Sequence, residues 1–278
     1  MNISDEEWFE LQFDISEARA KYGIALPSLP SDEVQVGFTG LSGRPNLRQA
    51  FSFYQYLLAA TRIDRLTRPR IMDFGGGWGR VARLLLRETT PDQIVIVERM
   101  AFALNCIRET GAAFQVVHSE PAPPVRNLSG TFDLVFAYSV FSHLSEPYFR
   151  NWIDYLLTLL RPGASLVFTT RGRTFINHLE RLHFTKKEAE PGLKEHVRRL
   201  REEMPPPSEI RRKFLEGKFQ FYPIGGAGEL TPDFFGETFI PKTYIEEHYG
   251  PFFISFDDHV PNVDQSVIVL RRPIEEHE

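Results

Sequence analysis

Residues 70–80 read Arg-Ile-Met-Asp-Phe-Gly-Gly-Gly-Trp-Gly-Arg, and the apolar run Val-Ala-Arg-Leu-Leu-Leu follows at 81–86. The apolar residues at 71–74 predict a short buried strand, and Val81, Leu84 and Leu85 predict one face of a helix. Glycine at 75, 77 and 79 permits a sharp turn and lets a ligand approach the backbone closely. Because the free N–H groups of a helix N-terminus favour anionic groups, this strand, turn and helix predict a site for a nucleotide-type cofactor.

The pattern Asp-x-Gly-x-Gly-x-Gly at 73–79 resembles the first motif of the class I, seven-strand methyltransferases that use S-adenosylmethionine (SAM). A dinucleotide fingerprint Gly-x-Gly-x-x-Gly would need glycine where Arg80 stands, and a phosphate-binding loop would need Gly-Lys-Ser/Thr. Leu-Arg-Pro-Gly at 160–163 resembles the junction before strand five of the same family. The resemblance extends over about residues 68–171, with a further similarity in the terminal strand at 263–273.

The resemblance implies an α/β fold with a Rossmann-like, doubly wound sheet of seven mostly parallel strands and an antiparallel last strand. Apolar runs predict the strands that follow the first one at 93–98, 113–117, 131–137, 165–170, 252–256 and 265–270. We expect an N-terminal helical extension at 1–67, with a helix over 4–22 and a turn-rich loop at 37–43. A methyltransferase domain is expected at 68–278, with a helical insertion at about 172–230 that Pro191 and Gly192 interrupt. If the extension folds over the cofactor, Arg44 and Arg48 are candidates to meet its carboxylate.

Glu98 ends the apolar run at 93–98, about 20 residues after the glycine turn. A carboxylate at the end of a second strand can accept hydrogen bonds from both hydroxyls of a ribose, and the resemblance implies the same role. Ser119 and Glu120 stand where relatives place a residue that meets the adenine amino group. The predicted cofactor-binding set is Asp73, Phe74, Gly75, Gly77, Gly79, Glu98, Ser119, Glu120 and Ala137.

Methyl transfer needs alignment of the methyl group with its acceptor, and a general base helps when the acceptor must lose a proton. His143 follows the fourth predicted strand and is the candidate base, with Tyr138 as a candidate positioning group. The alternative for His143 is a capping or packing role, and Tyr244 and His259 are then the next candidates. No metal site is expected.

Composition limits the other classes of function. The 278 residues carry a formal charge of −5, so the chain lacks the basic excess typical of nucleic-acid-binding proteins. The single cysteine excludes an intramolecular disulfide and a multi-cysteine zinc site. The N-terminus lacks signal-peptide order, and no run reaches the roughly 18 apolar residues of a membrane span. We therefore expect a soluble, cytoplasmic protein.

Residues 171–217 hold 12 Lys/Arg and 8 Asp/Glu, so this segment is more basic than the whole chain. Such a run is usually a solvated helix face, but its place after strand five also suits a lid or a segment that recognises an acidic acceptor. The sequence therefore predicts transfer of a methyl group to an oxygen or nitrogen of a small molecule or glycan precursor. Two alternatives remain open: a non-catalytic SAM-binding scaffold and an NAD(P)-dependent oxidoreductase.

Overall fold

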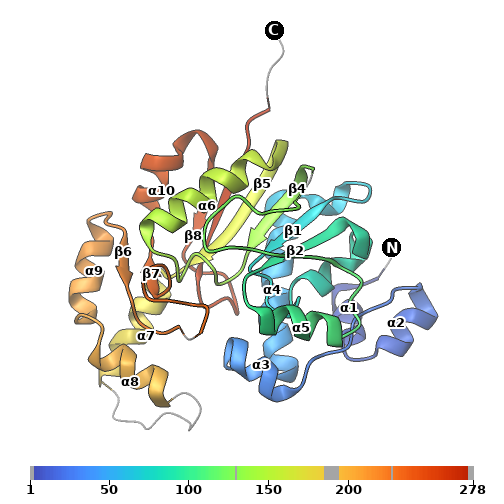
Figure 1. Cartoon of the computed structure of the whole chain (residues 1–278), viewed down its shortest axis with the longest axis horizontal. Coiled ribbons are helices and arrows are strands. Elements are labelled where there is room, and N and C mark those ends of the chain that lie inside the picture. The colour runs from blue at the N-terminus through green and yellow to red at the C-terminus, as the bar shows by residue number, and fades with distance from the viewer. Residues whose placement is uncertain (1–2, 129, 185–193, 227, 275–278) are drawn as a thin grey trace.

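One sheet of seven strands forms the centre of the molecule, in the order β3-β2-β1-β4-β5-β9-β8 (Figure 1). The computed structural model describes residues 3–128, 130–184, 194–226 and 228–274. Strands β1 to β5 pair in parallel, whereas β9 runs antiparallel to both of its neighbours. The bounds are β1 Ile71–Phe74, β2 Ile94–Glu98, β3 Gln115–His118, β4 Phe132–Ala137, β5 Leu160–Thr170, β8 Phe253–Asp257 and β9 Ser266–Arg271. The predicted mostly parallel sheet with an antiparallel last strand is confirmed.

Helices cover both faces of this sheet. Successive residues of a strand point to opposite faces, so the apolar strands present side chains that must be buried on each face. Ile71 belongs to the apolar cluster that includes Phe53 of helix α4, whereas Met72 belongs to the cluster of Trp152 on helix α6. The helices are α1 Asp5–Leu11, α2 Ile15–Tyr22, α3 Asp32–Thr39, α4 Gly43–Thr61, α5 Ala101–Glu109, α6 Glu146–Thr158, α7 Arg173–Phe184, α8 Lys194–Glu202, α9 Pro207–Leu215 and α10 Lys242–Tyr249. The fold is therefore doubly wound.

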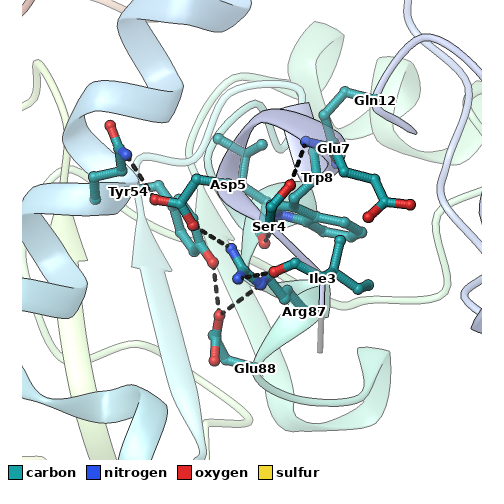
Figure 2. Close-up of polar contacts among 11 residues, drawn as sticks. Ile3, Ser4, Asp5, Glu7, Trp8, Gln12, Tyr54, Arg87 and Glu88 are labelled. Carbon is teal, nitrogen blue, oxygen red and sulfur yellow. Dashed lines mark hydrogen bonds and ion pairs between the residues drawn. The ribbon is translucent and has the colours of Figure 1, made fainter. Parts of the chain in front are cut away.

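The N-terminal extension is anchored to the core through the segment that follows the glycine turn (Figure 2). Trp8 is fully buried, and its indole N–H donates to the backbone carbonyl of Leu84 at 3.0 Å. Arg87 reaches back to Asp5 with an N–O distance of 2.7 Å and also donates to the carbonyl of Ile3. Residues far apart in sequence thus fix helix α1 against the core.

The indole of Trp8 provides a test of this anchor. We expect Trp8→Phe to lower the free energy of unfolding by about 1–3 kcal/mol, because it leaves the buried carbonyl of Leu84 without its donor. Urea denaturation measures the change. Trp78→Phe is the matched control, because the buried indole N–H of Trp78 has no hydrogen-bond partner among the described residues. If Trp78→Phe lowers the free energy of unfolding by as much as Trp8→Phe, the loss is due to the smaller ring and not to the missing hydrogen bond.

Three local expectations were wrong. A single helix over 4–22 is instead two helices, because Asp14 caps a second helix by accepting from the N–H of Glu17. The turn-rich loop expected at 37–43 overlaps helix α3, which begins after the capping side chain of Ser31. The helix expected after the glycine turn is a short 3-10 helix, Ala82–Arg87, whose apolar residues are all buried.

The insertion after β5 contains helices α7 to α9 and a second, two-stranded sheet of β6 Gln220–Tyr222 and β7 Glu237–Phe239. It has its own apolar cluster, which includes Phe175, Ile210 and Phe239. In Figure 1, α8 and α9 lie on the opposite side of the molecule from α1 and α2. The Pro-Gly interruption at 191–192 falls outside the described residues. The boundaries at 67/68 and about 172–230 stay predictions.

Among the described helices, none combines the length and the apolar character that crossing a membrane requires.

Candidate functional site

A cavity lies at the carboxyl ends of four neighbouring parallel strands. Strand order reverses between β1 and β4, which is where open α/β sheets bind their ligands. The cavity and the open space at its mouth together contain about 650 Å³ of empty volume. Its wall on the sheet side includes Phe74 and Gly75 from β1, Glu98 from β2, Ser119 and Glu120 after β3, and Ser139 after β4.

The segment between β6 and β7 supplies the opposite wall with Leu230, Phe234 and Phe235. The segment that carries them reaches the end of β2, where the Glu229 carboxylate accepts from the N–H of Ala101 at 3.1 Å. Sequence reasoning missed this wall, because nothing in the glycine- and proline-containing segment 223–236 indicates which strand end it contacts.

The glycine turn adopts the backbone conformation that its composition predicts. Gly75, Gly77 and Gly79 have φ values of +69°, +56° and +83°, which side chains rarely allow. A Cβ on Gly75 would lie only 2.3 Å from a methyl carbon of Val140, so the turn also packs against the segment after β4. Because a 3-10 helix of six residues follows, the expected α-helix N-terminus is missing here.

Glu98 is the buried carboxylate of the cavity. Its Oε1 accepts from the N–H groups of Arg99 and Met100 at 2.7 and 2.8 Å, and its Oε2 accepts from Gly77 at 2.8 Å. Burial raises the pKa of Glu98 above its usual range, and these backbone hydrogen bonds oppose the rise. A carboxylate has about four lone-pair positions, so one position on Oε2 remains for a ligand. The three backbone hydrogen bonds thus leave room on this carboxylate for one further donor, and its predicted contact with both ribose hydroxyls stays a prediction.

Asp73 lies next to the glycine turn and does not line the cavity. It is buried, and its Oδ2 has no hydrogen-bond partner in the part of the chain that the structure describes. A Cβ on Gly76 would lie 2.8 Å from that oxygen. Burial, followed by the nearby Glu98, raises the pKa of Asp73 to about 8. Of the other predicted cofactor residues, Gly77, Gly79 and the fully buried Ala137 are also absent from the cavity wall.

Tyr138 packs against the N-terminal extension. Its ring lies 4.8 Å from the ring of Phe53 on α4, and the guanidinium of Arg80 lies 5.0 Å from its centroid. Burial raises the pKa of Tyr138 to about 12, so its hydroxyl stays protonated near neutral pH. Tyr138 is not a cavity residue.

His143 lies immediately behind the cavity wall. Its ring stacks on Phe235, which lines the cavity, with centroids 4.8 Å apart. Its Nδ1 lies 2.7 Å from the carbonyl oxygen of Gly236, so in the neutral ring Nδ1 carries the proton and Nε2 is the basic atom. Glu237 is buried beside it and pairs with Arg171 at 2.8 Å.

The arginine that follows the glycine turn and the two candidate arginines of the extension lie away from the cavity wall. Arg80 is buried and donates to the side chains of Asn46 and Gln49 on α4, at 2.7 and 2.8 Å. Arg44 pairs with Glu10 at 2.6 Å and Arg48 with Glu6 at 3.5 Å. Neither Arg44 nor Arg48 lines the cavity. In the described part of the chain, no group of His, Cys, Asp and Glu side chains could hold a metal ion.

Known proteins show the same fold. The structure resembles an S-adenosylmethionine-dependent methyltransferase from Clostridium acetobutylicum ATCC 824 with a TM-score of 0.52 and 11% identity, over 80% of this chain and 91% of that one. It resembles CalS10, an amino pentose methyltransferase from Micromonospora echinaspora, with a TM-score of 0.51 and 12% identity, over 88% and 98%.

Comparison with known sequences identifies the family to which the chain belongs. A curated relative, the malonyl-[acyl-carrier protein] O-methyltransferase of Paenibacillus sp. (strain JDR-2), is 31% identical over 137 residues, which are 43% of this chain and 47% of the relative. The match thus spans about half the length of that protein. A family described as a methyltransferase domain matches residues 45–220, more than half of the chain. The chain therefore belongs to the methyltransferase-domain family.

Proposed function

We propose that this enzyme moves a methyl group from SAM to an oxygen or nitrogen of a small molecule or glycan precursor. The observation that carries the proposal is a single cavity that runs from the end of β3 past Glu98 and Gly75 to Ser139. That path crosses the switch in strand order and brings the buried carboxylate of Glu98 and the glycine turn to one cavity.

The residues on the wall fit this cofactor. Glu98 would hold the ribose through the open position on Oε2, and Ser119 and Glu120 would lie beside the adenine. Gly75 would adjoin the sulfur end of the cofactor, since it follows β1, which lies between the strand that ends at Glu98 and the strand that precedes Ser139. Phe234 and Phe235 would exclude water from the other side. Asp73 would hold the turn in place without touching the ligand.

When bound, SAM supplies a methyl group on a positively charged sulfur, which an acceptor attacks in line. We propose His143 as the base that takes the proton of the acceptor, through Nε2. The Nδ1 contact with Gly236 sets the required tautomer, and the ion pair of Glu237 with Arg171 holds β7 beside the ring. Because Phe235 stacks on one face of the imidazole, this role requires the acceptor to approach Nε2 in the plane of the ring.

The name of the curated relative supports an oxygen as the methyl acceptor. An acidic acceptor is a narrower proposal, and it depends on the basic residues of the insertion. Several of these pair with glutamates one helical turn away, such as Arg199 with Glu203 at 2.9 Å and Arg212 with Glu216 at 2.6 Å. These ion pairs weaken the positive electrostatic potential that an acidic acceptor would meet at the insertion.

Ionic strength tests this narrower proposal. If the insertion binds an acidic acceptor, the KM for that acceptor should rise between low and high salt, because salt screens exposed charges. An acceptor KM that does not change with salt would contradict recognition by these residues. Steady-state kinetics at constant pH measures the effect, with the SAM affinity measured at each salt concentration as the control.

The proposed activity is tested by incubating the purified enzyme with SAM carrying a labelled methyl group and a panel of hydroxy acids, amino sugars and thioester-linked acids. We expect one class to gain the label at oxygen or nitrogen. Label transferred to carbon, or to protein or nucleic acid in place of any small molecule, would contradict the proposal.

A further inference from the structure

Ser139 is the second residue after the end of β4, and it lies on the cavity wall. It has φ +61°, the left-handed conformation that residues other than glycine rarely adopt. Its backbone N–H donates to the Thr169 hydroxyl on β5 at 2.8 Å. Its own hydroxyl oxygen accepts from the Gln265 side-chain amide at 2.8 Å. The hydroxyl of Ser139 is therefore held in a fixed place at this strand end.

The third contact closes these bonds into a ring. The Thr169 hydroxyl donates to the amide oxygen of Gln265 at 2.7 Å. Thr169 is fully buried and already accepts from Ser139, so its hydrogen needs an acceptor. If the amide were flipped, Thr169 would receive two donors and, among its contacts in the described residues, would lose its acceptor. The amide nitrogen of Gln265 therefore faces Ser139.

This arrangement determines the direction in which the Ser139 hydroxyl can donate a hydrogen bond. Its oxygen is used as an acceptor by Gln265, so its O–H hydrogen is directed out of the ring. The oxygen of Ser142 is 3.4 Å away, a long and weak contact for two hydroxyls. The other direction is the cavity, where Ser139 lies at the end opposite Ser119. The cavity therefore receives one oriented hydrogen-bond donor at its β4 end.

The proposed function places the nucleoside at the β2 and β3 end, so the amino-acid half of the cofactor would extend toward β4. Outside the nucleoside, the oxygen acceptors of SAM are those of its carboxylate. We propose that the Ser139 hydroxyl, oriented by Gln265 and Thr169, donates a hydrogen bond to the carboxylate of the cofactor. This inference rests on the proposed placement of SAM, and it assigns a role to a residue that the sequence did not single out.

Calorimetry with two ligands tests the assignment. S-adenosylhomocysteine carries the carboxylate, whereas 5′-methylthioadenosine has the same nucleoside and thioether but no amino-acid group. We expect Ser139→Ala to weaken S-adenosylhomocysteine binding roughly tenfold or more, the usual scale for a hydrogen bond to a charged group. Binding of 5′-methylthioadenosine should stay at the wild-type level.

Two further variants make the result specific. Ser139→Gly keeps the positive φ without strain and retains the N–H bond to Thr169, so it should show the same selective loss in a well-folded protein. Ser119→Ala, at the nucleoside end, should change the affinities of both ligands alike. Equal affinity of the Ser139 variants and the wild type for S-adenosylhomocysteine, or an equal loss for both ligands, would overturn the assignment. Wild-type protein that binds neither ligand would instead overturn the proposed cofactor site.

Discussion

Replacing Glu98 by alanine is expected to weaken SAM binding roughly tenfold to a hundredfold, which corresponds to about 1.5–3 kcal/mol. The substitution removes one charge-assisted bond to the ribose, since three backbone N–H groups already occupy the other positions on the carboxylate. It also frees the N–H of Gly77, which loosens the glycine turn. Isothermal titration calorimetry measures the affinity, and thermal unfolding separates it from lost stability.

Glu120→Ala is the matched control for this prediction. Glu120 lines the same cavity, but its side chain is 60% exposed, so water replaces its contacts at little cost. We expect a much smaller change in affinity for this variant. Unchanged SAM affinity in Glu98→Ala, with the fold intact, would show that the ribose does not lie on this carboxylate.

His143→Ala is expected to lower the rate of methyl transfer by roughly 10²-fold or more, the usual cost of losing a general base. SAM affinity should be preserved, because Glu98 and the glycine turn are untouched. A neutral imidazole near physiological pH can accept the proton, since the unperturbed pKa of histidine is about 6.5. Single-turnover kinetics at saturating SAM, with an acceptor identified by the labelled-methyl screen, measures the chemical step.

His248→Ala is the matched control, because that histidine has similar contacts away from the cavity. Its Nδ1 lies 2.9 Å from the carbonyl of Tyr244, and its ring stacks on the Tyr244 ring. This variant should turn over normally. If His143→Ala loses only thermal stability while its folded fraction remains active, His143 packs β7 against the sheet, and the base must be sought at Tyr244 or His259.

Individual strands and the glycine turn could be predicted because they depend on local patterns, whereas the doubly wound sheet was implied by the family resemblance. Apolar runs locate β1, β2 and β4, and the glycine turn identifies the end of β1 that faces a ligand. Glu98 was found because a carboxylate directly ends an apolar strand. Five of the predicted cofactor residues line the cavity: Phe74, Gly75, Glu98, Ser119 and Glu120.

The remaining features depend on contacts between distant segments. The wall that contains Phe234 and Phe235 exists only because Glu229 meets the start of α5. The ring at Ser139 needs β5 and the start of β9 beside the end of β4, so no local pattern predicts it. The 3-10 form after the glycine turn was also missed, since its apolar spacing is equally consistent with an α-helix.

A crystal structure with S-adenosylhomocysteine tests the central claim most directly. The account predicts a ribose hydroxyl within hydrogen-bond distance of Glu98 Oε2, the adenine beside Ser119 and Glu120, and the amino-acid half between Gly75 and Ser139. A ligand bound outside this cavity, or bound in it with the nucleoside at the β4 end, would contradict the account.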